Sequence, residues 1–126
     1  DKLYRFGRQL GLAFQVVDDI LDFTGSDQQL GKPAASDLAS GYLTAPTFYA
    51  MEEHSALQPL IAREFSQDGD LGQALDMVRS SQAIPRAREL AETFARESRE
   101  AISWLSDSPS KTALLELPDF VLSRLY

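Results

Sequence analysis

The residues from Gly11 to Phe23 place narrow limits on how this chain can fold. At a helical period of 3.6 residues, the polar side chains of this stretch fall on one stripe, at i, i+3, i+4 and i+7. The stripe consists of Gln15, Asp18, Asp19 and Asp22. Almost every other position is apolar, which is the reverse of a typical surface helix. The pattern therefore predicts a helix that is buried on most sides and carries three crowded carboxylates.

Three carboxylates on a buried helix need a positive partner, because an uncompensated charge away from water is destabilising. Arg8 is the one basic residue in the preceding turns on the same stripe, and it cannot neutralise all three. A divalent cation can, and carboxylate oxygens suit Mg²⁺, which is commonly shared with substrate phosphates. The alternative is an acidic helix end that serves only solubility. Against it, the carboxylates lie late in the helix, where negative charge is unfavourable.

The segment after the acidic helix has the features of a phosphate-binding loop. Lys32 lies between Gly31 and Pro33, and the proline restricts the lysine to an extended backbone. A lysine fixed in this way can reach a phosphate held by the same metal. A solvated surface lysine is the alternative, and the spacing alone leaves both open.

Taken together, these motifs resemble the second Asp-rich motif of the trans-polyprenyl diphosphate synthases, in particular the solanesyl-type long-chain enzymes of cyanobacteria and plastids. The resemblance rests on FQVVDDILD at 14–22, LGKP at 30–33, DL at 37–38, Gly41 and TAP at 44–46. It is sharp over residues 3–50 and vaguer in the remainder. It implies an isoprenoid synthase-type helical bundle. Residues 1–126 would be its C-terminal portion, without the N-terminal half that bears the first Asp-rich motif.

The resemblance also implies an activity. Enzymes of this family condense isopentenyl diphosphate with an allylic prenyl diphosphate. Here the product would be an all-trans long-chain polyprenyl diphosphate, a precursor of quinone side chains. The implied cofactor is Mg²⁺, with Asp18 and Asp19 as metal ligands and Asp22 as a weaker candidate. The 126 residues alone are expected to be inactive, because the opposite wall of the site is missing.

Three further residues receive roles from the resemblance. Gln15 would act with the aspartates in catalysis, Lys32 would bind the diphosphate, and Phe14 would border the allylic substrate. Many relatives carry a lysine after the glycine at Gly41, whereas this chain has Tyr42. One diphosphate contact of the family is therefore in doubt here.

The family resemblance leads us to expect a homodimer that touches membranes only peripherally, through its product. It would be cytoplasmic in a bacterium or cyanobacterium and plastidial in an alga or plant. Twelve basic and 19 acidic residues give a net charge of −7, which argues against a nucleic-acid-binding surface. No apolar run is long enough for a transmembrane segment. Two other classes stay open: a non-catalytic helical partner or regulatory subunit, and a terpene cyclase, which the loop lysine disfavours.

Nothing in the chain has the alternation of a strand, and the predicted fold class is all-α. The least helical stretch is 26–43, where glycines and a proline recur. Helices are expected over 2–24, from Thr44 onward, over 57–65, from Asp70 in a capping box, over 84–105, and over 110–126 with a split at Pro118.

Overall fold

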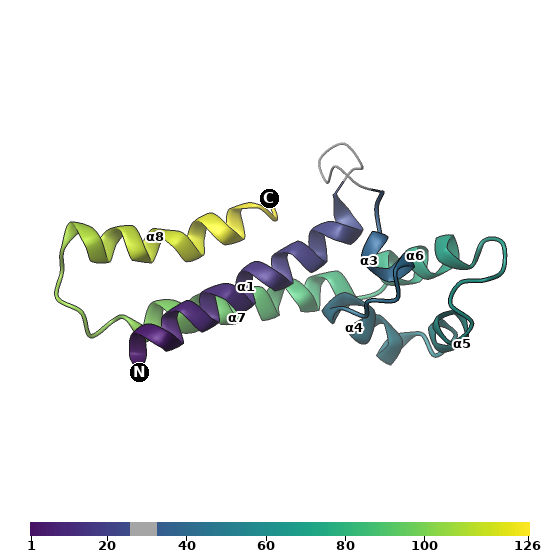
Figure 1. The fold of residues 1–126 in the computed structure, drawn as a ribbon, viewed down its shortest axis with the longest axis horizontal. Helices are drawn as coiled ribbons and strands as arrows, with labels where there is room; N and C mark the ends of the chain where they lie inside the picture. Colours follow the sequence, from purple (N-terminus) through teal and green to yellow (C-terminus); the bar gives the residue numbers. More distant parts are fainter. Residues whose placement is uncertain (26–32) are drawn as a thin grey trace. The chain divides into compact units, whose positions relative to one another are not determined.

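The computed structural model describes residues 1–25 and 33–126, and every regular element in these ranges is a helix (Figure 1). The helices are α1 (Lys2–Thr24), α3 (Ser36–Ala39), α4 (Ala45–Glu53), α5 (Leu57–Ala62), α6 (Asp70–Ser80), α7 (Ala83–Ala101) and α8 (Pro109–Ser123). The all-α prediction is confirmed, as is the long first helix. None of the described helices is long and apolar enough to cross a membrane.

The chain forms two compact units. The first unit contains Asp1–Asp18 and Arg88–Tyr126, and the second contains Asp19–Ala87. Helices α1 and α7 each contribute residues to both units, so the predicted acidic stripe begins in one unit and ends in the other.

In the first unit, α1, α7 and α8 run alongside one another (Figure 1). Their apolar contacts include Phe6, Leu10, Ala101, Ile102, Leu105, Leu114 and Leu115. The part of α1 in this unit buries one face rather than most sides. On its other face Leu3, Tyr4 and Phe14 are 51%, 71% and 47% exposed. The burial on most sides was predicted for residues 11–23, where Ala13, Val16, Val17, Ile20 and Phe23 are buried and Phe14 is exposed. Leu3 and Tyr4 lie outside that stretch.

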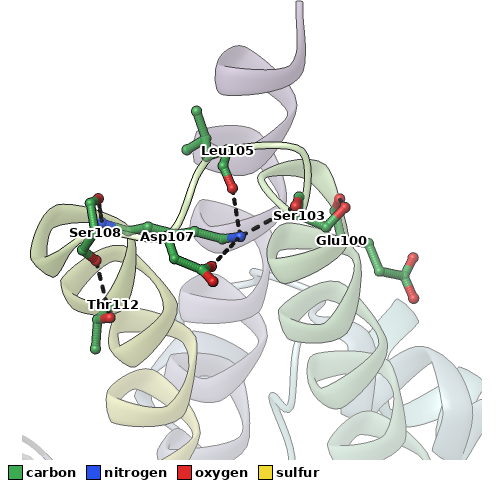
Figure 2. A network of polar contacts seen from close by, with 7 residues as sticks. Glu100, Ser103, Leu105, Asp107, Ser108 and Thr112 are labelled. Atoms are coloured by element: carbon green, nitrogen blue, oxygen red, sulfur yellow. Dashed lines mark hydrogen bonds and ion pairs between the residues drawn. The ribbon is translucent and has the colours of Figure 1, made fainter.

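The helix expected over 84–105 ends earlier, at Ala101. Figure 2 shows the polar network that closes the turn between α7 and α8. The Lys111 ammonium donates to the Leu105 carbonyl at 2.7 Å, and the Ser108 hydroxyl accepts from the Lys111 backbone N–H at 3.0 Å. Ser108 thereby caps the start of α8, which satisfies one of the free N–H groups at a helix N-terminus.

Helix α8 is continuous through Pro118, so the predicted split at this residue is wrong. Proline removes a single i to i−4 hydrogen bond, and neighbouring packing can offset that loss. Pro118 and Val121 are both buried in the first unit, which provides such packing.

The second unit contains the last turns of α1, helices α3 to α6 and the first turn of α7. Helices α4, α5 and α6 pack against one another. The largest buried apolar side chains of this unit include Ile20, Phe23, Leu38, Leu57 and Val78.

Two details of the second unit differ from expectation. Helix α5 ends at Ala62, before residue 65, because Glu64 and Phe65 adopt positive φ angles of 56° and 54°. Helix α6 does begin at Asp70, but Gly69 occupies the N-cap position and Asp70 makes no capping bond. The predicted capping box is therefore wrong.

The Asp70 carboxylate instead forms a bidentate ion pair with Arg63. The guanidinium Nε and Nη2 donate to the two carboxylate oxygens at 2.7 and 2.6 Å. These hydrogen bonds from Arg63 lower the pKa of the Asp70 carboxyl. The pair ties the start of α6 to the end of α5.

Candidate active site

Helix α1 carries all four polar residues of the predicted stripe, in an unbroken run of 23 helical residues. Its last turn contains no basic residue. The negative end of the helix dipole therefore adds to the negative charge of the aspartates that precede it. A helix end of this kind needs a cation from elsewhere in the chain or from solution.

Arg79, on α6, supplies one positive charge at this end. Its Nε and Nη2 donate to the Phe23 carbonyl at 2.9 and 2.7 Å. The last carbonyls of a helix have no donor within the helix, so this contact satisfies one of them and places a cation where the dipole favours it. Arg79 thereby fixes the end of α1 that carries Asp19 and Asp22.

Asp22 is almost completely buried, with 1% of the residue exposed. Its Oδ1 accepts from the Ser36 hydroxyl at 3.3 Å, and its Oδ2 accepts from the Asp37 backbone N–H at 3.3 Å. Its main-chain carbonyl accepts from the Ala35 N–H at 2.7 Å. Asp22 thus stabilises the start of α3, a short helix in the stretch expected to be least helical. It joins the end of α1 to the chain that follows the predicted phosphate-binding loop.

The two adjacent aspartates have different surroundings. Asp19 is 8% exposed and belongs to the second unit. Asp18 belongs to the first unit, and its side chain is 42% exposed. The Asp18 Oδ1 lies 2.8 Å from Nη2 of Arg124, at the end of α8. Asp18 is therefore the carboxylate of the stripe that is most open to solvent.

The Arg124 guanidinium also lies over the ring of Phe14, 5.0 Å from the ring centroid. It therefore touches two residues that the sequence places in the site. Gln15, on the same part of α1, is exposed. Neither Arg124 nor Arg79 was predicted, and no signal in the sequence could have revealed them. Each contributes through a contact with a distant part of the chain.

Two predictions concern the loop after α1. Lys32 lies outside the described residues, so its role stays a prediction. Tyr42, at the position where the family resemblance leads us to expect a lysine, is 68% exposed, and its backbone N–H donates to the Asp37 carbonyl at 2.9 Å. Gly41 precedes it with φ at 86°, a conformation that favours glycine. The backbone of this turn is fixed, and the phenol faces solvent.

A complete metal cage is absent from the described part of the chain. Among the residues at 1–25 and 33–126, no three histidine or carboxylate side chains are grouped so that they could hold a metal ion. The carboxylates of Asp18 and Asp19 are nevertheless hard oxygen donors of the kind that Mg²⁺ prefers, and Mg²⁺ is usually bound by one or two protein carboxylates with waters and phosphate. The donor set fits one wall of a magnesium site.

The second unit also contains a hollow of about 390 Å³, away from the stripe in sequence. It is lined by Ala39, Ser40, Gly41, Leu43, Ile61, Glu64 and Phe65. Of these lining residues, none is basic and one is acidic. The hollow is therefore unsuited to a diphosphate, which needs cationic partners.

Comparison with known proteins decides the family. The model of the polyprenyl synthetase family matches residues 1–78, which include the whole of α1, α3, α4 and α5. The chain belongs to the polyprenyl synthetase family. The acidic stripe on α1 lies within the matched residues.

Named relatives of this polyprenyl synthetase chain align with nearly all of it. It is 54% identical over 126 residues to a prenyl transferase of Synechocystis sp., covering 100% of this chain and 39% of the relative. It is 45% identical over 125 residues to solanesyl diphosphate synthase 2, chloroplastic, of Arabidopsis thaliana, covering 99% and 30%. The chain therefore spans about two fifths or less of the length of these relatives.

Solved structures of the family share the fold. Heptaprenyl diphosphate synthase from Staphylococcus aureus matches with a TM-score of 0.90 at 31% identity, covering 97% of this chain and 39% of the other. The apo form of an Arabidopsis medium/long-chain length prenyl pyrophosphate synthase matches with a TM-score of 0.84 at 39% identity, covering 98% and 43%. The predicted fold, part of an isoprenoid synthase-type bundle, is confirmed.

Proposed function

We propose that this chain is the C-terminal part of a trans-polyprenyl diphosphate synthase. The complete enzyme would condense isopentenyl diphosphate with an allylic prenyl diphosphate to make an all-trans long-chain polyprenyl diphosphate. The observation that carries the proposal is the alignment of nearly the whole chain with relatives named prenyl transferase and solanesyl diphosphate synthase. The same names support this function over a terpene cyclase or a non-catalytic partner.

The proposed cofactor is Mg²⁺, held by Asp18 and Asp19. A related polyprenyl synthase from Caulobacter crescentus, with a TM-score of 0.82 and 31% identity, was solved in complex with calcium and isoprenyl diphosphate. A divalent cation at the stripe would supply charge neutralisation for a departing diphosphate. The role of Asp22 is proposed to be mainly structural, because its carboxylate oxygens already accept hydrogen bonds from Ser36 and Asp37.

The remaining residues of the site have roles around the metal. The Gln15 amide is exposed near Asp18 on α1 and can hydrogen-bond the reacting end of the substrate. The exposed Phe14 ring offers an apolar surface to an allylic chain and a π face to an allylic cation. Lys32 is proposed to bind the diphosphate, where a charged hydrogen bond contributes about 1.5–3 kcal/mol.

The chain by itself is proposed to be inactive. One helix with three carboxylates forms only one wall of the site, and a second wall must hold the diphosphate from the other side and orient the second substrate. In the complete relatives, more than half of the length lies outside the part that this chain matches. The second wall of the site is proposed to lie in that remaining part of the full-length protein.

The proposal is tested with labelled isopentenyl diphosphate, geranylgeranyl diphosphate and Mg²⁺, on the 126-residue chain and the full-length protein in parallel. We expect long-chain product from the full-length protein and none from the chain alone. The matched control is full-length protein with EDTA in place of Mg²⁺. Label in product from the chain alone would refute the missing wall, and no product from the full-length protein with any allylic primer would refute the function.

The assembly and location are also part of the proposal. Exposed apolar side chains on the first unit, among them Leu3, Tyr4 and Phe120, are surfaces that the rest of the protein and a second copy would cover. We propose a homodimer, which light scattering of the full-length protein tests directly. The relatives come from a cyanobacterium and from chloroplasts. We accordingly propose that the protein is located in the cytoplasm if its source is a bacterium, and in the plastid if its source is a plant or alga.

A further inference from the structure

Arg124 connects the end of α8 to two residues of the proposed site at the same time. Its Nη2 lies 2.8 Å from the Asp18 Oδ1, and its guanidinium lies 5.0 Å from the centre of the Phe14 ring. The Arg124 and Asp18 side chains are 35% and 42% exposed, so the pair is accessible to water and to ions. All three residues belong to the first unit.

The residues after α8 are attached mainly through side chains. The Tyr126 hydroxyl donates to Glu92 Oε1 at 3.3 Å, and the Arg88 guanidinium lies 5.9 Å from the centre of the Tyr126 ring. The backbone N–H groups of Leu125 and Tyr126 donate to the Leu122 and Ser123 carbonyls of α8 at 3.0 and 3.2 Å. Separation of residues 124–126 from α1 and α7 would therefore break side-chain contacts and leave these backbone hydrogen bonds to α8 in place.

We propose that Arg124 is a positioning residue that occupies Asp18 in the metal-free protein and is displaced when a divalent cation binds there. The inference rests on the proposed function, because it takes Asp18 as a metal ligand. Displacement detaches residues 124–126 and exposes the face of the Phe14 ring that the guanidinium covers. Metal binding and access to Phe14 are then coupled through one arginine.

The physical reason is a competition between two cations for one carboxylate. A metal ion bound at Asp18 would lie within a few ångströms of the guanidinium, and like charges at that distance repel each other. An exposed ion pair is weak, and a cation–π contact at an exposed site adds little. A divalent ion that is also held by Asp19 and by a diphosphate therefore displaces the arginine. The arginine in turn lowers the apparent affinity for the metal.

The first experiment titrates Mg²⁺ into the metal-free full-length enzyme by calorimetry, with inorganic pyrophosphate at a fixed saturating concentration. Arg124→Gln is expected to lower the apparent Kd for Mg²⁺ about twofold to tenfold, the range expected for loss of an exposed pair and a cation–π contact. Arg124→Lys keeps the charge but lacks the planar guanidinium. Its apparent Kd for Mg²⁺ should lie between those of the unmodified enzyme and Arg124→Gln. Unchanged or weaker Mg²⁺ binding by Arg124→Gln would overturn the proposal.

The matched control is Arg99→Gln. Arg99, on α7, pairs with Asp119, on α8, so this variant also removes an ion pair of α8 but leaves the stripe untouched. Its apparent Kd for Mg²⁺ should equal that of the unmodified enzyme. An equal gain of affinity in both variants would mean that loosening α8, and not the loss of Arg124, is responsible.

A second readout is hydrogen exchange of the backbone amides at 122–126, followed by mass spectrometry. Mg²⁺ with pyrophosphate should accelerate exchange in the unmodified enzyme, whereas Arg124→Gln should exchange quickly under all conditions. Slower exchange on metal binding would show that Arg124 stays in place, and would overturn the displacement.

Asp18→Asn separates this inference from the proposed function. If Asp18→Asn weakens Mg²⁺ binding and Arg124→Gln leaves it unchanged, only the role of Arg124 fails. If Asp18→Asn leaves Mg²⁺ binding unchanged, the metal assignment fails, and the inference fails with it.

Discussion

Asp18 and Asp22 occupy the same stripe of one helix, yet the two units give them different surroundings. In the first unit, Asp18 is 42% exposed at its side chain and pairs with an arginine that is itself partly exposed. In the second unit, Asp22 is 1% exposed and accepts hydrogen bonds from Ser36 and Asp37. A carboxylate that water can reach is available to a metal, whereas one that is buried and bonded has a structural use. The same residue type in one motif can therefore serve two purposes.

Arg124 of the first unit differs in the same way from Arg79 and Arg63 of the second. Arg124 pairs with an exposed carboxylate, which costs little to break. In the second unit, Arg79 binds the main-chain carbonyl of Phe23 with two donors, and Arg63 binds the buried carboxylate of Asp70. Contacts in the second unit thus fix the end of α1. In the first unit, the Asp18 carboxylate can exchange its arginine partner for another cation.

The largest expected effect tests whether the exposed aspartate is the functional one. In the full-length enzyme, Asp18→Asn should lower kcat/KM by about 100-fold or more, the size of loss found when one preorganised electrostatic contact is removed. Asp22→Asn should lower it by about tenfold or less, as for residues that support a ligand from behind. Steady-state kinetics with an allylic diphosphate measures both. Equal losses would show that the stripe works as one unit and would remove the contrast.

The next effect concerns stability and reverses the order of the two aspartates. Asp22→Ala should lower the free energy of unfolding by about 1–3 kcal/mol, because the partly buried donors of Ser36 and Asp37 lose their acceptor. Asp18→Ala should cost less than about 1 kcal/mol, since an exposed ion pair is worth little. Urea unfolding of the metal-free full-length enzyme gives both values. A larger loss for Asp18→Ala would contradict the assignment of Asp22 as the structural residue.

A smaller effect contrasts glycines of the two units. Gly69, at the start of α6, has φ at 86°, so Gly69→Ala should destabilise the second unit by about 1–2 kcal/mol. Gly7 lies within α1, and a Cβ built there meets nothing within 4 Å in the described structure. Gly7→Ala should therefore stabilise the helix by about 0.5–1 kcal/mol. Destabilisation by Gly7→Ala in the full-length enzyme would mean that another part of the protein packs closely on that face.

The last effect concerns Asp70 and is seen as a dependence of stability on pH in the acid range. Hydrogen bonds from Arg63 lower the pKa of Asp70 below its ordinary value of 3.8. The folded state then binds this proton more weakly than the unfolded state. The stabilisation is therefore complete above pH 3.8 and is lost as the pH falls through the lowered pKa.

Asp70→Asn should consequently flatten the dependence of unfolding free energy on pH in this acid range, as measured by urea unfolding at a series of pH values. The matched control is Asp68→Asn, two residues earlier and exposed, which should keep the slope of the unmodified protein. Identical slopes in all three proteins would remove the Arg63–Asp70 pair from the account of acid stability.

The sequence by itself determined the all-α class, the bounds of α1 and the family. These properties are local, because helical periodicity and short motifs are written in consecutive residues. The motif at 14–22 and the glycine- and proline-containing segment at 30–46 were enough to indicate a polyprenyl synthase. The comparisons confirmed the family. Helix ends were less well determined, since Gly69 and the positive φ angles of Glu64 and Phe65 depend on how the chain turns back on itself.

The resemblance ranked Asp22 below Asp18 and Asp19, but only the tertiary structure shows how the surroundings of these carboxylates differ. Helical spacing makes Asp18 and Asp22 equivalent, since it records the face of a helix and not what lies opposite that face. Their partners, Arg124 on one side and Ser36 and Asp37 on the other, arrive from separate elements of the chain. Exposure and ionic partners are properties of packing between distant segments, and no local pattern in a single sequence records them.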